Sequence, residues 1–304
     1  MVSLDYTLKR IKKIDVLPTF PDIIDGIISI IEDPMSSAAD LAKKMDPAMV
    51  GEVMRVANTA YFGTKNFRNI STIEHAIAII GYEHLSYILL QMPFLTMVNV
   101  DDETFDRIGF IRHSIASGVI AKIISLTVRL GNPHEVYISG IVHDIGTIII
   151  YQHFRQAWNM INSLVHDKKI PRLTAEREIF TVDHGYIGAI LLENWNIPKS
   201  ITEGVMFHHS PGESESFKSN TLVTHLGNEF SKRIDFDLDF MDFDGFVNNH
   251  RNFIDYMVEM GGHFAPSDEV IFLEKVYDLV KGVNGYLRGT MEGEKGIYDT
   301  RCCC

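Results

Sequence analysis

The chain has 304 residues, of which 46% are hydrophobic and 22% are charged, and its formal net charge is −12. These values are typical of a soluble globular protein with room for one large or two medium domains. A general nucleic-acid-binding protein needs a basic surface, so the acidic balance argues against that class and leaves only a local basic patch open.

The sequence predicts neither a secretory signal nor a membrane span, and it predicts no disulfide framework. The first ten residues lack the apolar segment of a secretory signal, and no apolar run reaches the roughly 18 residues of a membrane span. We therefore expect a cytoplasmic protein without a membrane partner. The cysteines are Cys302, Cys303 and Cys304, and this contiguous triplet excludes a disulfide framework. An unstructured end is the favoured interpretation, and a tail that binds soft metals or forms disulfides between molecules is the alternative.

Helical periodicity marks the first hundred residues. An apolar stripe follows Pro21-Asp22 and consists of Ile23, Ile24, Ile27, Ile28 and Ile31. Asp46-Pro47 predicts a helix start, because Asp can cap and Pro suits the first turn, and this helix is expected to end near Gly63. Ser71-Thr-Ile-Glu74 has the form of a capping box and predicts a helix that Gly81 ends.

Further helices are predicted through the middle of the chain. Two long ones span about Phe110–Leu130 and Glu135–Phe154 and are joined by Gly131-Asn-Pro133, and a third spans about Thr174–Trp195. A second capping box, Ser200-Ile-Thr-Glu203, is expected to open the short helix that carries His208 and His209.

Composition changes at residue 235. The Asp-x-Asp-x-Asp start of residues 235–246 suggests a calcium loop, but Phe240 and Phe246 occupy the positions where an EF-hand needs Gly and Glu. The segment is therefore interpreted as a linker. Two more helices are expected after it, over Val247–Glu259 and Pro266–Leu287.

A set of histidines with one acid and one amide is the main functional signal. It consists of His113, His143, Asp144, His184, His208, His209 and Asn228, each in a segment predicted to be helical. Imidazoles and carboxylates that converge from several helices hold transition metals in helical bundles. The alternative is a metal-free core of hydrogen-bonded histidines.

Helix geometry alone does not bring His113 and His143 together. In a hairpin that turns at Asn132, His113 lies 19 residues before the turn and His143 lies 11 after it. The offset is about 12 Å at 1.5 Å per residue. A steep crossing angle would be required to close it.

The motifs of the chain resemble those of the HDOD proteins, bacterial signalling modules related to the HD metal-dependent phosphohydrolases. The matching segments in the first half are Leu17-Pro-Thr-Phe-Pro21, Ile31-Glu-Asp-Pro34, Leu41-Ala through Asp46-Pro47, Met54-Arg-Val-Ala-Asn-Thr-Ala-Tyr-Phe-Gly63, Ile73-Glu-His-Ala-Ile77 and Ile80-Gly81. Those in the second half are Arg112-His-Ser114, Gly140-Ile-Val-His-Asp-Ile-Gly146, Glu178 to His184 followed by Ile187-Gly-Ala189, Trp195-Asn-Ile-Pro198 and Phe207-His-His-Ser-Pro211. The likeness covers roughly residues 10 to 232.

The resemblance implies an all-α fold of two packed halves. An N-terminal helical half would occupy residues 1–100 and an HD-like half residues 101–234, followed by a linker and helical extension over 235–304. By position, His113, His143, Asp144, His184, His208 and His209 match the ligands that surround one or two metals in HD enzymes. Asn228 stands where those enzymes have a final Asp. Iron, manganese, nickel or zinc would suit this set.

Several departures put hydrolysis in doubt, and no catalytic residue is assigned. Asn228 brings no negative charge, and Thr147 stands where the related HD-GYP enzymes carry a Lys. The loop Ser210–Ser216 adds acidic groups beside the expected phosphate position. Arg112 or Lys199 would have to supply positive charge to a nucleotide-like substrate.

The favoured hypothesis is a regulatory scaffold that acts through a protein partner in a signalling pathway, with a metal at the histidine set and a small-molecule ligand left open. The alternatives are a metal-dependent phosphohydrolase and a purely structural helical protein. Arg55 and Asn58 are the candidate partner-binding residues, because Arg and aromatic groups gather near them. An architectural role, in which Asn58 bonds backbone at the helix end, is the competing interpretation.

Overall fold

The structure is a computed structural model of the whole chain, and it describes residues 2–14, 45, 47–58, 70, 72–81, 85, 88–89, 94, 97–98 and 105–232. Every secondary-structure element among these residues is helical, which confirms the predicted all-α class. The predicted stripe of residues 23–31, the acidic segment 235–246, the two helices after it and the cysteine triplet lie outside the described residues.

Three helices precede the long central one: α1 (Leu4–Ile11), α4 (Pro47–Ala57) and α5 (Ile73–Ile80). Helix α4 begins at the predicted Pro47 but ends at Ala57, before the expected end near Gly63. Helix α5 ends at Gly81 as predicted, yet its N-cap is Thr72, whose hydroxyl accepts from the backbone N–H of His75, so the helix start predicted at Ser71 is one residue early.

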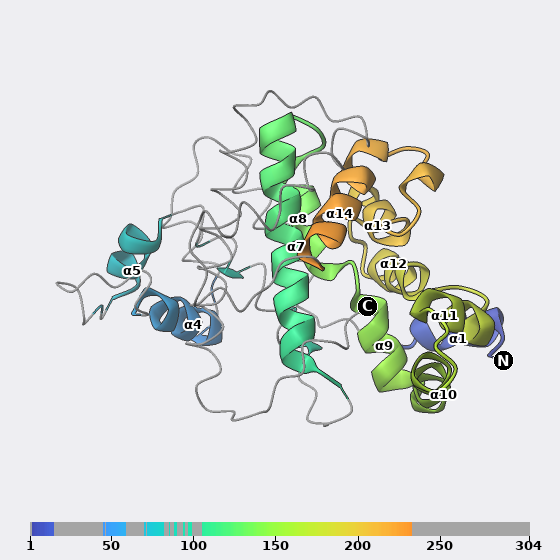
Figure 1. Cartoon of the computed structure of the whole chain (residues 1–304). Helices are drawn as coiled ribbons and strands as arrows, with labels where there is room; N and C mark the ends of the chain where they lie inside the picture. Colours follow the sequence, from blue (N-terminus) through green and yellow to red (C-terminus); the bar gives the residue numbers. More distant parts are fainter. Residues whose placement is uncertain are drawn as a thin grey trace.

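Helix α1 lies far from α4 and α5 in space, on the opposite side of the molecule (Figure 1). The backbone N–H of Val2 donates to the carbonyl of Ile179 at 2.7 Å, and the ring of Tyr6 meets that of Phe154 edge-on. The first residues of the chain therefore pack on the helices of its second half.

Helix α7 (Arg107–Val128) runs through the centre of the molecule, with α4 and α5 on one side and the later helices on the other (Figure 1). It packs against α8 (Pro133–Val142) and α14 (Lys218–Ser231). By length and composition α7 could cross a membrane, contrary to the expectation from the sequence, but 78% of its most apolar window is buried. That burial is typical of a core helix.

Two glycines let α7 and α8 approach closely. A Cβ on Gly118 would lie 2.6 Å from the carbonyl oxygen of Tyr137, and one on Gly140 would lie 2.5 Å from Cα of Gly118. Only hydrogen fits in this contact. The crossing point lies five residues after His113 and three before His143, so the offset between the two histidines is two residues, about 3 Å along the axis.

Two helices predicted to be continuous are broken. The predicted helix Glu135–Phe154 divides into α8 and α9 (Ile145–His153), with a turn at His143-Asp144. The predicted helix Thr174–Trp195 divides into α11 (Arg172–Phe180) and α12 (His184–Asn194), because Thr181 adopts a left-handed backbone with φ of 66°. Both breaks lie beside candidate metal ligands.

The remaining helices complete the second half: α10 (Arg155–His166), α13 (Lys199–Met206) and a 3-10 turn, η1 (Pro211–Glu213). The capping box predicted at Ser200 is wrong. The Ser200 hydroxyl donates to Glu135, and Glu203 accepts from the Ser214 hydroxyl and from the backbone N–H groups of Ser216 and Phe217. Glu203 thus fixes the loop after the histidine pair and does not cap α13.

Candidate metal centre

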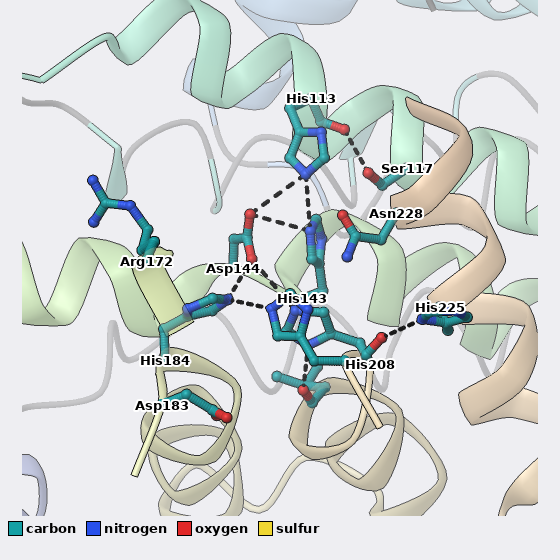
Figure 2. A network of polar contacts seen from close by, with 12 residues as sticks. His113, Ser117, His143, Asp144, Arg172, Asp183, His184, His208, His225 and Asn228 are labelled. Carbon is teal, nitrogen blue, oxygen red and sulfur yellow. Dashed lines mark hydrogen bonds and ion pairs between the residues drawn. The ribbon is translucent and has the colours of Figure 1, made fainter. Parts of the chain in front are cut away.

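The breaks in the helices place the candidate ligands at helix ends, where they turn toward one point. His143 follows the last residue of α8, and Asp144 is the N-cap of α9. An Asp at this position usually accepts a backbone N–H of its own helix. The Asp144 side chain makes no such bond and faces the imidazoles instead (Figure 2).

The other candidates come from further helices. His184 is the first residue of α12, which Asp183 caps by accepting the N–H of Tyr186. His208 and His209 follow the end of α13, and Asn228 lies on α14. His113 lies on α7. The structure therefore brings all seven predicted residues to one region. For His113 and His143, simple hairpin geometry had not predicted this proximity.

Each oxygen of the Asp144 carboxylate faces a different pair of imidazoles. Oδ2 lies 3.2 Å from Nε2 of His143 and 3.4 Å from Nε2 of His113. Oδ1 lies 3.0 Å from Nε2 of His184 and 3.6 Å from Nε2 of His208. His209 joins the second pair, because its Nε2 lies 2.9 Å from Nε2 of His184. Asp144 therefore belongs to two overlapping groups of close ligand atoms, which are His113, His143 and Asp144, and Asp144, His184, His208 and His209.

Hydrogen bonds on the far side of the ring fix the orientation of His143, His208 and His113. Nδ1 of His143 donates to the Gly140 carbonyl at 2.7 Å, and Nδ1 of His208 donates to the Val205 carbonyl at 2.6 Å. Nδ1 of His113 lies 2.9 Å from the hydroxyl oxygen of Ser231. A ring that carries its proton on Nδ1 presents the lone pair of Nε2, which is how histidines are held for a metal.

Glu176 orients His184 from a fully buried position on α11. Its Oε2 accepts both the backbone N–H of His184, at 2.9 Å, and the ring Nδ1, at 2.7 Å. Carboxylate–histidine–metal triads have this arrangement. Sequence reasoning missed Glu176, because Glu176, Glu178 and Asp183 all lie close before His184 and nothing in the pattern separates them.

The ionisation of the cluster suits a cation. Burial opposes the charge on Asp144, but its electrostatic interactions and hydrogen bonds with His143, His184 and His113 outweigh burial and hold the pKa of the carboxyl well below its usual value. Burial lowers the pKa of His208 to about 4. Burial and the neighbouring His208 also lower the pKa of His209 strongly. Both rings are therefore neutral at pH 7, the form that binds metal.

His184 behaves in the opposite way. Burial disfavours its charged form, but the carboxylates of Glu176 and Asp144 raise its pKa to about 10. Without a metal, His184 therefore carries a second ring proton and a positive charge at pH 7, and a metal ion would replace one of its protons.

Buried polar atoms without a partner support the fit of this set to a metal. Among the described residues, both side-chain atoms of Asn228 and Nε2 of His208 are buried and make no hydrogen bond. Buried polar groups in folded proteins are nearly always satisfied, so such atoms call for an absent ion, water or ligand. An amide oxygen and an imidazole nitrogen are both metal ligands.

A cavity of about 600 Å³ opens beside the cluster. His113, Asp144, His184, His209 and Asn228 form part of its wall, and Arg172 and Lys232 are the basic residues that line it. Neither Arg112 nor Lys199, the predicted sources of positive charge, is among the lining residues. Glu213 and Glu215 of the predicted acidic loop do not line it either, so the expected repulsion of a phosphate by that loop is unsupported.

The candidate partner residues lie apart from this cluster, on and just after α4. The Asn58 amide donates to the carbonyls of Met54 and Ile70, and its oxygen accepts the Ile70 N–H at 3.1 Å. These bonds tie the end of α4 to the approach to α5, as the architectural interpretation of Asn58 requires.

Comparison with known proteins agrees with the sequence motifs. A relative from Treponema pallidum, named only as uncharacterized, is 25% identical over 213 residues, which is 68% of this chain and 40% of the relative. The chain therefore spans less than half the length of that protein.

Solved structures share the fold. An HDOD domain protein of unknown function from Geobacter sulfurreducens aligns with a TM-score of 0.69 at 21% identity, over 94% of this chain and 98% of that one. A candidate phosphohydrolase from Shewanella amazonensis aligns with a TM-score of 0.67 at 20% identity, over 93% and 97%. A candidate signal-transduction protein from Marinobacter aquaeolei aligns with a TM-score of 0.60 at 14% identity, over 92% of this chain and 64% of that one. The sequence itself matches the HDOD domain over residues 17–211, and the chain belongs to the HDOD family.

Proposed function

We propose that this HDOD protein is a signalling protein that holds one or two divalent transition-metal ions at the cluster around Asp144. The observation that carries the proposal is the Asp144 carboxylate, whose two oxygens each face two imidazole Nε2 atoms within 3.6 Å. A packed core has no need to gather six ionisable groups around one point, four of them buried.

The residues divide into two sets that share Asp144. One set is His113, His143 and Asp144, and the other is Asp144, His184, His208 and His209, with Asn228 as a further neutral donor. Neutral imidazoles with one carboxylate suit iron, manganese, nickel and zinc. A bound ion of this kind supplies Lewis acidity and lowers the pKa of a bound water.

The signalling role rests on the family and on contacts made outside the cluster. A candidate signal-transduction protein is among the structural neighbours. Within the segment that was predicted to bind a partner, the bonds of Asn58 to Met54 and Ile70 favour an architectural role for that residue, and Arg55 remains the proposed contact.

Elemental analysis tests the metal proposal. Untagged protein purified without chelator should contain about one to two equivalents of transition metal, and the double variant His143→Ala/Asp144→Ala should contain almost none. His134→Ala is the matched control, since this histidine lies on α8 outside both ligand groups. Wild-type protein that stays metal-free and keeps its melting temperature after each ion is added would refute the proposal.

A second candidate function, metal-dependent hydrolysis of a phosphate ester, is favoured by one observation. The cavity opens on Asp144, His113, His184 and His209 and holds Arg172 and Lys232 in its wall. Metal-assisted hydrolysis needs this kind of access together with positive charge around the reacting phosphate.

A further inference from the structure

One part of the cavity wall, formed by Trp158 of α10 and Arg172 of α11, holds hydrogen-bond donors that the described part of the protein leaves unsatisfied. Nε1 of Trp158 and Nη1 of Arg172 are both buried and have no hydrogen-bond partner there. Indole and guanidinium groups are hydrogen-bond donors and not acceptors, so the partner that both side chains lack is a hydrogen-bond acceptor.

The two side chains hold each other in place. The guanidinium of Arg172 lies over the Trp158 ring, with its central carbon 5.0 Å from the ring centroid. Its Nη2 donates to the Asn162 side-chain oxygen at 3.1 Å. A guanidinium stacked on an aromatic ring and fixed at one edge is pre-organised to donate from the other edge, in the fork that matches a carboxylate or phosphate.

Among the charges of the cavity, Arg172 is the cation with the weakest counter-charge. Lys232 is paired with Glu229 at 3.0 Å. The acid near Arg172 is Glu176, but its Oε1 lies 3.9 Å from Nη1, and its other oxygen is held by His184 at 2.7 Å. In Figure 2, Arg172 stands to one side of the histidine cluster and joins none of the drawn contacts.

We propose that Arg172 and Trp158 form a subsite for the anionic group of a small organic anion, a phosphate ester or a carboxylate, whose apolar remainder lies against the aromatic wall. That wall is provided by Phe105 and Phe110. The volume, about 600 Å³, is that of a small-molecule pocket. The subsite adds a ligand class to the proposed function. It rests on that function only in that a metal ion bound at the cluster would attract the anion more strongly.

Tryptophan fluorescence can report on this subsite directly. The chain has two tryptophans, Trp158 in the cavity and Trp195, which is 1% exposed and does not line the cavity. In a Trp195→Phe background the signal comes from Trp158 alone. Phenylphosphonate and benzoate serve as probes of the two anion types, and inorganic phosphate lacks the apolar part. If the Trp195→Phe variant folds poorly, calorimetric titration of protein that retains both tryptophans measures the same affinities.

Both organic anions should change the Trp158 fluorescence, and the tighter of them identifies the anionic group. Inorganic phosphate should bind more weakly. Arg172→Gln should weaken binding by about 10- to 100-fold, since a charged hydrogen-bond donor is lost, and Arg172→Lys should lie between. Arg155→Gln is the matched control, because Arg155 lies over the Tyr151 ring at 4.6 Å but does not line the cavity, and it should bind as the parent does.

Measurements with and without added Mn²⁺ separate this inference from the metal proposal. Arg172-dependent binding in chelator-treated protein would sustain the subsite even if no metal is taken up. Metal uptake with anion affinities that Arg172→Gln leaves unchanged, or no binding of either organic anion up to about 10 mM, would overturn the subsite alone.

Discussion

Glu176 accepts two hydrogen bonds from His184, one from the backbone and one from the ring, and so sets how that imidazole is presented. We predict that Glu176→Gln raises the apparent Kd for Mn²⁺ or Zn²⁺ by about 10- to 100-fold, because the carboxylate that supports the ligand is lost. Competition with a fluorescent chelator measures the affinity. The matched control is Glu135→Gln, in which the lost carboxylate serves Ser200 and Asn220 away from the cluster and metal affinity should hold. Equal affinities in wild type and Glu176→Gln would contradict this role.

His184 also predicts a pH dependence in metal-free protein. Its folded pKa of about 10 lies above the ordinary value of 6.5, so the stabilisation from its charge is complete below about pH 6.5 and is lost as the pH rises toward 10. The gap in free energy of unfolding between wild type and His184→Gln should therefore narrow from pH 7 to pH 10. Urea unfolding in the presence of chelator measures it, and a gap that stays constant over this range would contradict the assignment.

The same proton links pH to metal uptake. A metal can occupy Nε2 of His184 only after the ring has lost that proton, so metal affinity should rise with pH over the neutral and alkaline range. The residue types of the cluster could be predicted from the sequence, but the proton on His184 could not, because it depends on Glu176 and Asp144 packed around the ring.

Among the elements, the crossing of α7 and α8 decides whether His113 and His143 meet. Gly140→Ala should destabilise the fold by about 1–3 kcal/mol, because its Cβ would lie 2.5 Å from Cα of Gly118 and the helices would separate. It should also weaken metal binding. Thermal unfolding and chelator competition measure the two effects.

Gly51 is the control for this substitution, since it lies inside α4 and a methyl group added there would have no atom within 4 Å. Gly51→Ala should stabilise the protein by about 0.5–1 kcal/mol, because Ala is the better helix former. If both alanine variants raise the melting temperature, close packing at Gly140 is not what holds the two histidines together.

Most helices of the described residues were predicted, but α1 and α10 were not, and neither were the helix ends beside the cluster. Apolar residues flank His143-Asp144 on both sides, with Ile141-Val142 before the pair and Ile145, Ile148 and Ile149 after it, so the pattern gives no clear sign of the break. The break before His184 depends on a left-handed backbone at Thr181, a residue type that rarely signals one. Both interruptions become clear only when the side chains at the breaks are seen to serve one site.

At the scale of the whole molecule, the cluster joins α7, α8, α9, α12, α13 and α14 around one carboxylate (Figure 2). Sequence reasoning could name its members but not their proximity, because the close contact of Gly118 and Gly140 that shortens the His113–His143 offset is a tertiary property. Arg172 and Trp158 were missed for the same reason, since neither stands in a motif.

Catalysis is predicted to be weak. Asn228 contributes no charge to a bound cation, so metal-loaded protein should hydrolyse generic phosphodiesters and cyclic dinucleotides slowly, and Asn228→Asp should raise both metal affinity and any turnover. Steady-state assays with Mn²⁺ and Zn²⁺ measure this. Wild-type turnover of about 1–1,000 per second that His143→Ala abolishes would instead establish an enzyme.

The central claim, that Asp144 is shared by two sets of metal-binding histidines, is tested most directly by anomalous diffraction from crystals grown with Mn²⁺ or Zn²⁺. The account predicts anomalous density within coordination distance of Asp144, between its Oδ2 and the pair His113 and His143 or between its Oδ1 and the group His184, His208 and His209, and on both sides at full loading. Crystals of metal-treated protein that show ordered imidazoles and no anomalous density at Asp144 would contradict it.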